Sequence, residues 1–325
     1  MYLHDVVNWS DFNDETLSFY RAISVDMIQL DLRTGGKVEA ERHVRAGKDS
    51  TGIFEQAREK TESHGLKLQT VFMPVLEGIT LATEERDEEL GAFVRLIESI
   101  GKAGIPTLAW NFKPMGNFRT TSDIGRGSAV YSTFDYAEFA RSRPEPREPP
   151  VSAEVMWDNM VAFMRAAVPA AEKAGVNLAL HPDDPPIPEP LGGVAQICST
   201  VEQFRRIFGA VPSANHRMLF CQGCMTELAG PRGVYDIIAE MASRNKIALV
   251  HFRNVRGWLP RFAEVFIDEG EVDMRRAMET YRDNGYSGPF GMDHTPGFPQ
   301  SMAGPAGKAY ANGFIRAMIQ TVYGR

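Results

Sequence analysis

Short apolar runs alternate along this chain with longer stretches in which apolar residues recur every three or four positions. The short runs are typical of strands buried in a parallel sheet, and the longer stretches are typical of helices with one buried face. Glycine and proline separate many of these segments, as expected for turns. Eight runs are predicted strands, at residues 1–7, 26–32, 66–72, 107–112, 176–181, 218–221, 247–252 and 289–293.

Helical periodicity follows the predicted strands, and a last helix is expected to close the structure. The predicted helices lie near residues 10–23, 52–64, 85–103, 155–174, 199–208, 235–243, 273–284 and 307–322. This repeated strand–helix order predicts an α/β fold, a single (β/α)8 or TIM barrel that spans residues 1–325 as one catalytic domain. The length of the chain suits such a barrel with insertions.

Residues 113–150 interrupt this order, because they form a much longer excursion after the fourth strand than a usual βα loop. The segment contains Phe118, Tyr131, Phe134 and Tyr136 and ends in the sequence RSRPEPREPP. Its aromatic content favours a lid over the site or a contact between subunits. The alternative is a mobile insertion without a role.

Four of the predicted strands end in a side chain that can bind a metal: His181, Cys221, His251 and Asp293. The carboxyl ends of barrel strands converge on one rim, so residues far apart in sequence can meet there. Two imidazoles, a thiolate and a carboxylate suit a divalent transition metal. Any one of them alone could be a buried residue satisfied by its neighbours, but four in the same position favour a metal site.

The string HPDDPP places Asp183 and Asp184 in a proline-rigid turn beside His181. Each carboxylate could orient the imidazole, take part in catalysis or contact substrate hydroxyls, or simply hold the turn. Arg253 and Asn254 follow His251 directly. The planar fork of an arginine binds both oxygens of a carboxylate, so Arg253 is a candidate clamp for an acidic substrate. The alternative is an arginine on a surface loop.

His294 follows Asp293 directly, so we expect the two side chains to face different directions. With Asp293 on the metal, His294 is a candidate acid or base near the substrate, because imidazoles exchange protons near neutral pH. The alternative is a packed histidine. Asn111, Lys113 and Arg119 add polar groups at the same rim, as candidate substrate contacts. The remaining histidines, at positions 4, 43, 64 and 216, are predicted to be structural.

The three cysteines do not form a second kind of metal site. Cys221 and Cys224 form a C-x-x-C, but a zinc ribbon needs a second pair and a thioredoxin-like motif belongs to a smaller domain. We expect Cys224 to lie in the loop after the strand and not to bind metal. An odd cysteine count without an export signal suggests reduced thiols in the cytoplasm.

Composition limits the classes of partner. The formal net charge is −7 and no basic face or tract is evident, which argues against binding to nucleic acid. No apolar stretch is long enough to span a membrane, and no signal peptide pattern begins the chain. Glycine-rich nucleotide motifs and a G-x-S-x-G elbow do not occur. A small-molecule substrate is therefore expected, with a homo-oligomer, a dimer or a tetramer, as the assembly.

The strings WNFKP, NLALHPDDPP, STVEQF, FCQG, VHFRNV, GEVDM and DH, in this order between Trp110 and His294, resemble the mannonate dehydratase family of the xylose-isomerase-like barrels. The resemblance implies a lyase of sugar acid catabolism and glucuronate degradation. Family members convert D-mannonate to 2-keto-3-deoxygluconate and water with a divalent metal, usually manganese. It also implies that His181, Cys221, His251 and Asp293 are the ligands and that His294 is an acid or base. Iron, cobalt or zinc could replace manganese.

The sequence departs from the family in one place. Phe298 stands in HTPGFPQ where the family has a catalytic tyrosine. Either Tyr131 or Tyr136 of the excursion replaces that hydroxyl, or the substrate is a different sugar acid. Two other functions stay open, a metal-dependent sugar isomerase or epimerase and an inactive relative that only binds a sugar acid. The isomerases generally use paired glutamates, which the cysteine position does not match.

Overall fold

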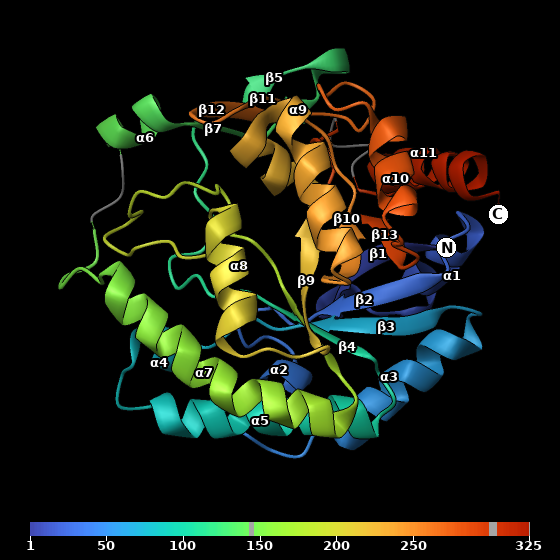
Figure 1. The fold of residues 1–325 in the computed structure, drawn as a ribbon. Coiled ribbons are helices and arrows are strands. Elements are labelled where there is room, and N and C mark those ends of the chain that lie inside the picture. Colours follow the sequence, from blue (N-terminus) through green and yellow to red (C-terminus); the bar gives the residue numbers. More distant parts are fainter. Residues whose placement is uncertain (143–145, 299–303, 325) are drawn as a thin grey trace.

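The computed structural model describes residues 1–142, 146–298 and 304–324. Eight parallel strands close into a barrel (Figure 1), which confirms the predicted fold class. In the order in which they pair around the barrel, the strands are β1 (Tyr2–Asn8), β13 (Pro289–Met292), β10 (Ile247–His251), β9 (His216–Cys221), β8 (Asn177–Leu180), β4 (Thr107–Trp110), β3 (Lys67–Phe72) and β2 (Met27–Asp31).

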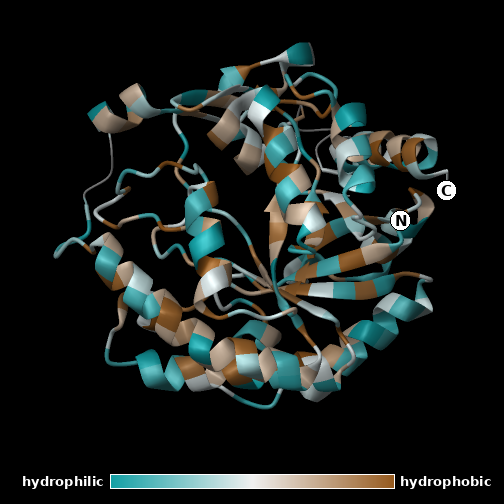
Figure 2. Cartoon of the chain, in the orientation of Figure 1, coloured by the Kyte–Doolittle hydropathy of each residue, from teal (hydrophilic) through white to brown (hydrophobic). Residues whose placement is uncertain are grey.

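Helices pack outside this barrel, with hydrophilic and hydrophobic residues alternating along them in Figure 2. Most predicted helices are found within a few residues of their expected bounds, and three short helices, α2, α4 and α6, were not predicted. The helices are α1 (Asp14–Ala22), α2 (Glu39–Arg45), α3 (Thr51–Ser63), α4 (Glu77–Leu81), α5 (Arg86–Lys102), α6 (Tyr136–Ser142), α7 (Ala153–Ala174), α8 (Val201–Ala210), α9 (Gln222–Ser243), α10 (Met274–Asp283) and α11 (Pro305–Tyr323). None of the described helices is long and apolar enough to cross a membrane.

Alternation along each strand decides which residues face the interior of the barrel. Phe72, Ala109, Ala179, Leu219 and Leu249 form a small buried cluster of their own. Their neighbours along the strands belong instead to the large core under the helices. Because strand side chains alternate with a period of two, the residues two positions after Ala179, Leu219 and Leu249 also face inward, at the carboxyl end. Those residues are His181, Cys221 and His251.

Two helices begin at other residues than predicted. The helix expected to start at residue 10 begins at Asp14, because Asn13 caps it by accepting a hydrogen bond from the amide of Thr16. The helix expected at 235–243 begins at Gln222, and Gly230 and Pro231 kink it. Cys224 therefore lies in the first turn of α9, and the prediction that it lies in a loop was wrong.

Residues 113–150 are not an isolated loop. They contain the short strands β5 (Asp123–Ile124), β6 (Val130–Tyr131) and β7 (Thr133–Asp135), followed by α6. β7 pairs with β12 (Arg261–Glu264), which forms a hairpin with β11 (Val255–Trp258) after the barrel strand β10. This hairpin was not predicted. The role of the excursion as a lid or subunit contact stays a prediction, and its residues 143–145 lie outside the described residues.

Candidate active site

The four predicted metal ligands meet at the carboxyl end of the barrel. One donor atom from each of His181, Cys221, His251 and Asp293 lies within 4.8 Å of all the others. The rings of His181 and His251 have centroids 5.7 Å apart, and Nδ1 of His251 lies 3.5 Å from Oδ2 of Asp293. β8, β9, β10 and β13 each end at or just before one of these residues. The prediction from residues that end the barrel strands therefore identified four side chains that the fold brings together.

The donor atoms of this cluster fit a divalent metal. Both ring nitrogens of His251 are buried and have no hydrogen-bond partner among the described residues. The Nδ1 of His181 lies 2.7 Å from the carbonyl oxygen of Pro182, which leaves Nε2 as the free donor. Orphaned nitrogens beside a thiol and a carboxylate are an arrangement that a borderline cation such as Mn²⁺, Fe²⁺ or Zn²⁺ would satisfy.

Electrostatics also favour ionised ligands. Burial opposes ionisation of the Cys221 thiol, but a hydrogen bond from Cys224 and the charge of Arg253 outweigh it and hold its pKa well below the usual value. Burial likewise opposes ionisation of Asp293, and the charges of His251 and His294 nevertheless hold its pKa well below the usual range. The pKa of His251 rises to about 9, because Asp293 and Cys221 outweigh the effect of burial. Without metal, the negative charges of Cys221 and Asp293 are therefore balanced by the positive charges of His251 and Arg253.

A cavity of about 90 Å³ opens onto the cluster, and polar side chains from several loops line it. Besides the ligands His181, His251 and Asp293, four of them were predicted as site residues: Asn111, Lys113, Asp184 and His294. Arg33 and Asn117 also line the cavity and were not predicted. Arg33 follows β2, so a search for polar residues just after the strands could have found it. Asn117 lies inside the irregular excursion.

Arg253 lies deeper than a substrate clamp would need to. Its side chain is 1% exposed, and its Nη1 lies 2.8 Å from Oε1 of Glu227 and 3.3 Å from Oε1 of Glu264. Its Nη2 lies 3.4 Å from Sγ of Cys224 and 3.5 Å from Oδ2 of Asp184. The alternative of a surface arginine was wrong, and the guanidinium instead neutralises a buried acidic cluster next to Cys221.

Asp183 and Asn254 both hold loops. Oδ2 of Asp183 accepts hydrogen bonds from the amide of Cys198 at 2.8 Å and the hydroxyl of Ser199 at 3.0 Å. The amide group of Asn254 donates to the carbonyl oxygens of Ile267 and Val272 and accepts from the amide of Val272. Their predicted roles in catalysis and substrate binding stay predictions, and the contacts seen here are structural.

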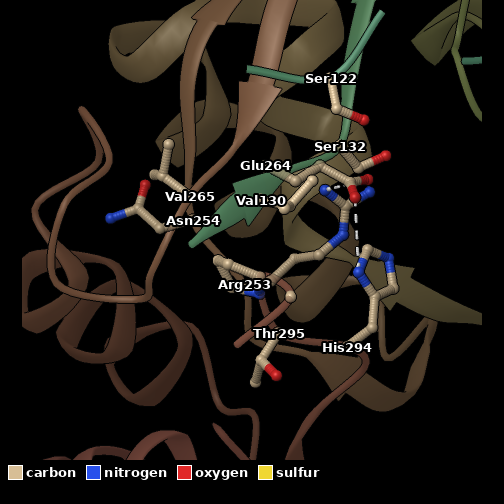
Figure 3. A pocket seen from close by; sticks show the side chains of 11 residues that line it. Ser122, Val130, Ser132, Arg253, Asn254, Glu264, Val265, His294 and Thr295 are labelled. Atoms are coloured by element: carbon tan, nitrogen blue, oxygen red, sulfur yellow. Dashed lines mark ion pairs between the residues drawn. The ribbon is translucent and has the colours of Figure 1, made fainter. Parts of the chain in front are cut away.

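A salt-bridge network ties the excursion to the site. Nη2 of Arg119 lies 2.7 Å from Oδ2 of Asp184 and 2.7 Å from Oε1 of Glu264. Glu264 also lies 3.4 Å from Nδ1 of His294 through its Oε2. Figure 3 shows Arg253, Glu264 and His294 gathered at the wall of a neighbouring cavity of about 180 Å³. Glu264 was missed because it belongs to the hairpin that the sequence pattern did not predict.

His294 lies beside its neighbour Asp293 and does not face away from it. Its Nε2 is 3.4 Å from Oδ2 of Asp293, and its side chain is 44% exposed. The expectation of opposite directions was wrong, because the chain leaves the extended conformation after Met292. His294 lines both cavities, so it remains accessible to a substrate next to the cluster.

His4 differs from the other histidines predicted to be structural. It lies in β1, fully buried, and neither ring nitrogen has a hydrogen-bond partner among the described residues. A Cβ atom at Gly291 would meet its Nδ1 at 2.4 Å, so the glycine makes room for the ring. Burial and the charge of His251 lower the pKa of His4 to about 3, which keeps this imidazole neutral.

The tyrosines proposed to replace the family hydroxyl lie elsewhere. Tyr131 donates to Glu269 and accepts from the amide of Arg126, and Tyr136 packs in an apolar cluster with Phe118. Phe298 packs against Phe266, with ring centroids 5.3 Å apart. Within the described ranges, neither cavity next to the cluster has a tyrosine in its wall.

Comparison with known proteins agrees with this geometry. The family described as D-mannonate dehydratase (UxuA) matches the chain over residues 49–146 and 145–321. The chain belongs to the D-mannonate dehydratase family. This confirms the predicted resemblance and the enzyme class, a lyase, and it does not favour the isomerase or epimerase alternative.

Individual relatives are more distant. Mannonate dehydratase 2 of Halalkalibacterium halodurans is 26% identical in an alignment of 261 residues. The alignment covers 72% of this chain and 75% of that protein. The crystal structure of mannonate dehydratase from Streptococcus suis has a TM-score of 0.83 at 23% identity and covers 99% of this chain and 94% of that one. A xylose isomerase domain protein from Planctomyces limnophilus has a TM-score of 0.65 at 13% identity, with 100% and 99% covered. These structures show the same xylose-isomerase-like barrel.

Proposed function

We propose that this member of the family dehydrates D-mannonate to 2-keto-3-deoxy-D-gluconate. In that reaction the C2–H bond and the bond between C3 and its hydroxyl break, water leaves, and the resulting enol becomes the 2-ketone. The observation that supports this proposal is the convergence of four donor atoms within 4.8 Å at the barrel rim. A divalent cation held there would bind the substrate carboxylate and stabilise the charge that develops on it when the C2 proton leaves.

Four residues would hold that cation: His181, Cys221, His251 and Asp293. We propose Mn²⁺ as the native ion, with Fe²⁺, Co²⁺ and Zn²⁺ as further candidates, because the set combines two nitrogens, a sulfur and an oxygen. Cys221 must be reduced to bind a metal, so we also propose a cytoplasmic location. A homo-oligomer and a place in glucuronate degradation belong to the same proposal.

His294 would move one of the two protons. It is the accessible imidazole that lies between the two cavities, and Glu264 lies 3.4 Å from its Nδ1. That carboxylate can fix the orientation of the ring, so that the imidazole could donate a proton to the leaving 3-hydroxyl. Arg253 would act indirectly, through Cys221, because its charge favours the ionised form of that thiol.

A panel of aldonates tests the substrate. The metal-loaded protein is incubated with D-mannonate and its stereoisomers, and the 2-keto-3-deoxy product is assayed. We expect turnover of D-mannonate in preference to neutral aldoses. Product from neutral aldoses at rates like those of the acids would contradict the proposal.

One observation favours a second candidate, the dehydration of a different aldonate. No tyrosine of the described residues lines the two cavities next to the metal cluster, and Phe298 packs against the ring of Phe266. A site that lacks this hydroxyl could accept another arrangement of substrate hydroxyls. In the same panel, a stereoisomer converted faster than D-mannonate would support the second candidate.

A further inference from the structure

We infer that Arg33 and Lys113 form the subsite that binds the carboxylate of the substrate, in place of Arg253. This inference rests on the proposed function, since it assumes a sugar acid at the metal cluster. Both residues line the cavity that contains His181, His251 and Asp293. They come from different strand ends, Arg33 after β2 and Lys113 after β4.

Arg33 is held in place while one edge of its guanidinium stays free. Its Nε donates to both oxygens of Asp31, at 3.0 and 2.9 Å, and its Nη2 also contacts Asp31. Its Cζ lies 4.3 Å from the centroid of the Phe72 ring, so the ring supports one face. Among the described residues, Nη1 makes no hydrogen bond, and the side chain is 49% exposed. The group is therefore oriented in advance, and Nη1 still has donors to offer a ligand.

Arg253 is less available for the same contact, although it lines the neighbouring cavity. Its Nη1 and Nη2 already face Glu227, Glu264 and Asp184, and its side chain is 1% exposed. A Cβ at Gly223 would lie 2.4 Å from its Cζ, so α9 covers it closely. A substrate carboxylate would have to displace buried ion pairs to reach this guanidinium, which costs several kcal/mol in typical buried pairs.

Lys113 supplies a second positive charge with freedom to move. Its Nζ donates to Asn117, which lines the same cavity, and Lys113 forms no salt bridge with the described residues. A fixed arginine and an adjustable lysine would recognise a carboxylate by charge and geometry together.

The test measures binding, which does not depend on turnover. The probes are the 3-deoxy analogue of D-mannonate, which has no hydroxyl to lose, and its uncharged primary amide. Their dissociation constants are measured by calorimetry on the metal-loaded wild type, Arg33→Gln, Arg33→Lys, Lys113→Met and the control Arg58→Gln. Arg58 is a suitable control because it forms only an exposed pair with Glu62 one helical turn away.

We expect Arg33→Gln to weaken binding of the acid about tenfold or more, the usual effect of losing a charged hydrogen bond, and to change binding of the amide less than twofold. Arg33→Lys should recover part of the loss, Lys113→Met should lose acid binding selectively, and Arg58→Gln should match the wild type. Elemental analysis should find the same metal content in all five proteins. If Arg33→Gln fails to fold, Arg33→Lys and Lys113→Met decide the question.

Equal weakening of acid and amide, or unchanged acid binding in both Arg33→Gln and Lys113→Met, would overturn the subsite. The proposed function fails differently. A wild type that binds the acid through Arg33 but does not convert D-mannonate would overturn the substrate while it supports the subsite. A wild type that converts D-mannonate with no dependence on Arg33 would support the substrate and overturn the subsite.

Discussion

The thiol of Cys221 is the residue that gives the metal cluster its character. Two imidazoles and a carboxylate alone would suit many cations, and the sulfur narrows the choice towards softer divalent ions. Cys221→Ser replaces a thiol of lowered pKa with a hydroxyl that does not ionise near neutral pH. We expect metal content, measured by elemental analysis, to fall at least tenfold.

The matched control is Cys224→Ser. Cys224 hydrogen-bonds to the Cys221 thiol, and a serine hydroxyl keeps a donor at this position. Metal content should therefore stay close to that of the wild type. Equal metal in wild type and Cys221→Ser, or its loss in Cys224→Ser alone, would move the ligand role to the other cysteine.

Gly223 is a second residue whose identity the site fixes. A Cβ atom there would lie 2.4 Å from Cζ and Nη1 of Arg253, so Gly223→Ala must push a buried guanidinium out of its acidic cluster. Disrupting such a buried ionic cluster typically costs about 3–5 kcal/mol. We expect a large fall in the thermal unfolding midpoint. Gly209→Ala, in α8 with no atom within 4 Å of the added carbon, should be neutral or slightly stabilising.

At the scale of elements, Arg119 joins the excursion to the rim. It bridges Asp184 and Glu264 at 2.7 Å each, and β7 pairs with β12 nearby. Arg119→Met keeps the apolar stem and removes both ion pairs, each typically worth about 1.5–3 kcal/mol when charged and partly buried. We expect limited proteolysis within residues 113–150 to accelerate about tenfold or more. Arg261→Met, which removes exposed pairs to Asp123 and Asp135, serves as the control.

The same change should alter acid stability. Burial opposes ionisation of Asp184, but Arg119, Arg253 and Lys113 lower its pKa from the ordinary 3.8 to about 2. A carboxyl with a lowered folded-state pKa contributes stability above pH 3.8, and this contribution disappears as the pH falls through about 2. Without Arg119 the shift shrinks, so acid unfolding should begin at a higher pH. An unchanged acid transition in Arg119→Met would assign the shift to Arg253 and Lys113 alone.

The sequence could predict the features that residues adjacent in the chain form, and it could not predict those that join distant segments. The barrel strands and their terminal ligands were predictable because an apolar run and the residue that ends it are adjacent in the chain. The pairing of β7 with β12 was not, because it joins segments more than a hundred residues apart. Glu264 and the burial of Arg253 depend on the sheet that contains β12 and on α9, so the sequence pattern assigned Arg253 the clamp role that we propose for Arg33.

At the scale of the whole molecule, we expect the barrel to fold without the metal and the metal to bind the folded barrel. Most of the core lies under the helices and inside the barrel, and Cys221 is the only one of the four ligands that belongs to it, so removal of metal with a chelator should leave the barrel folded. Metal added back binds the folded state and stabilises it by about 2.7 kcal/mol at a free concentration of 100 times Kd. The unfolding midpoint should rise by several degrees with Mn²⁺, and Cys221→Ser should show little rise.

This stabilisation should depend on pH in a defined direction. In the metal-free protein the pKa of His251 is about 9, because Asp293 and Cys221 outweigh burial, so the ring is protonated at pH 7. A raised pKa stabilises the metal-free fold at low pH, and that contribution is lost as the pH rises through about 9. A metal needs the neutral ring and must displace this proton, so its affinity should increase from pH 6 towards pH 9. Calorimetric titrations at pH 7 in buffers of different ionisation enthalpy should detect the released proton. Affinity that is flat over this range, with no proton released, would mean that His251 is already neutral before the metal binds.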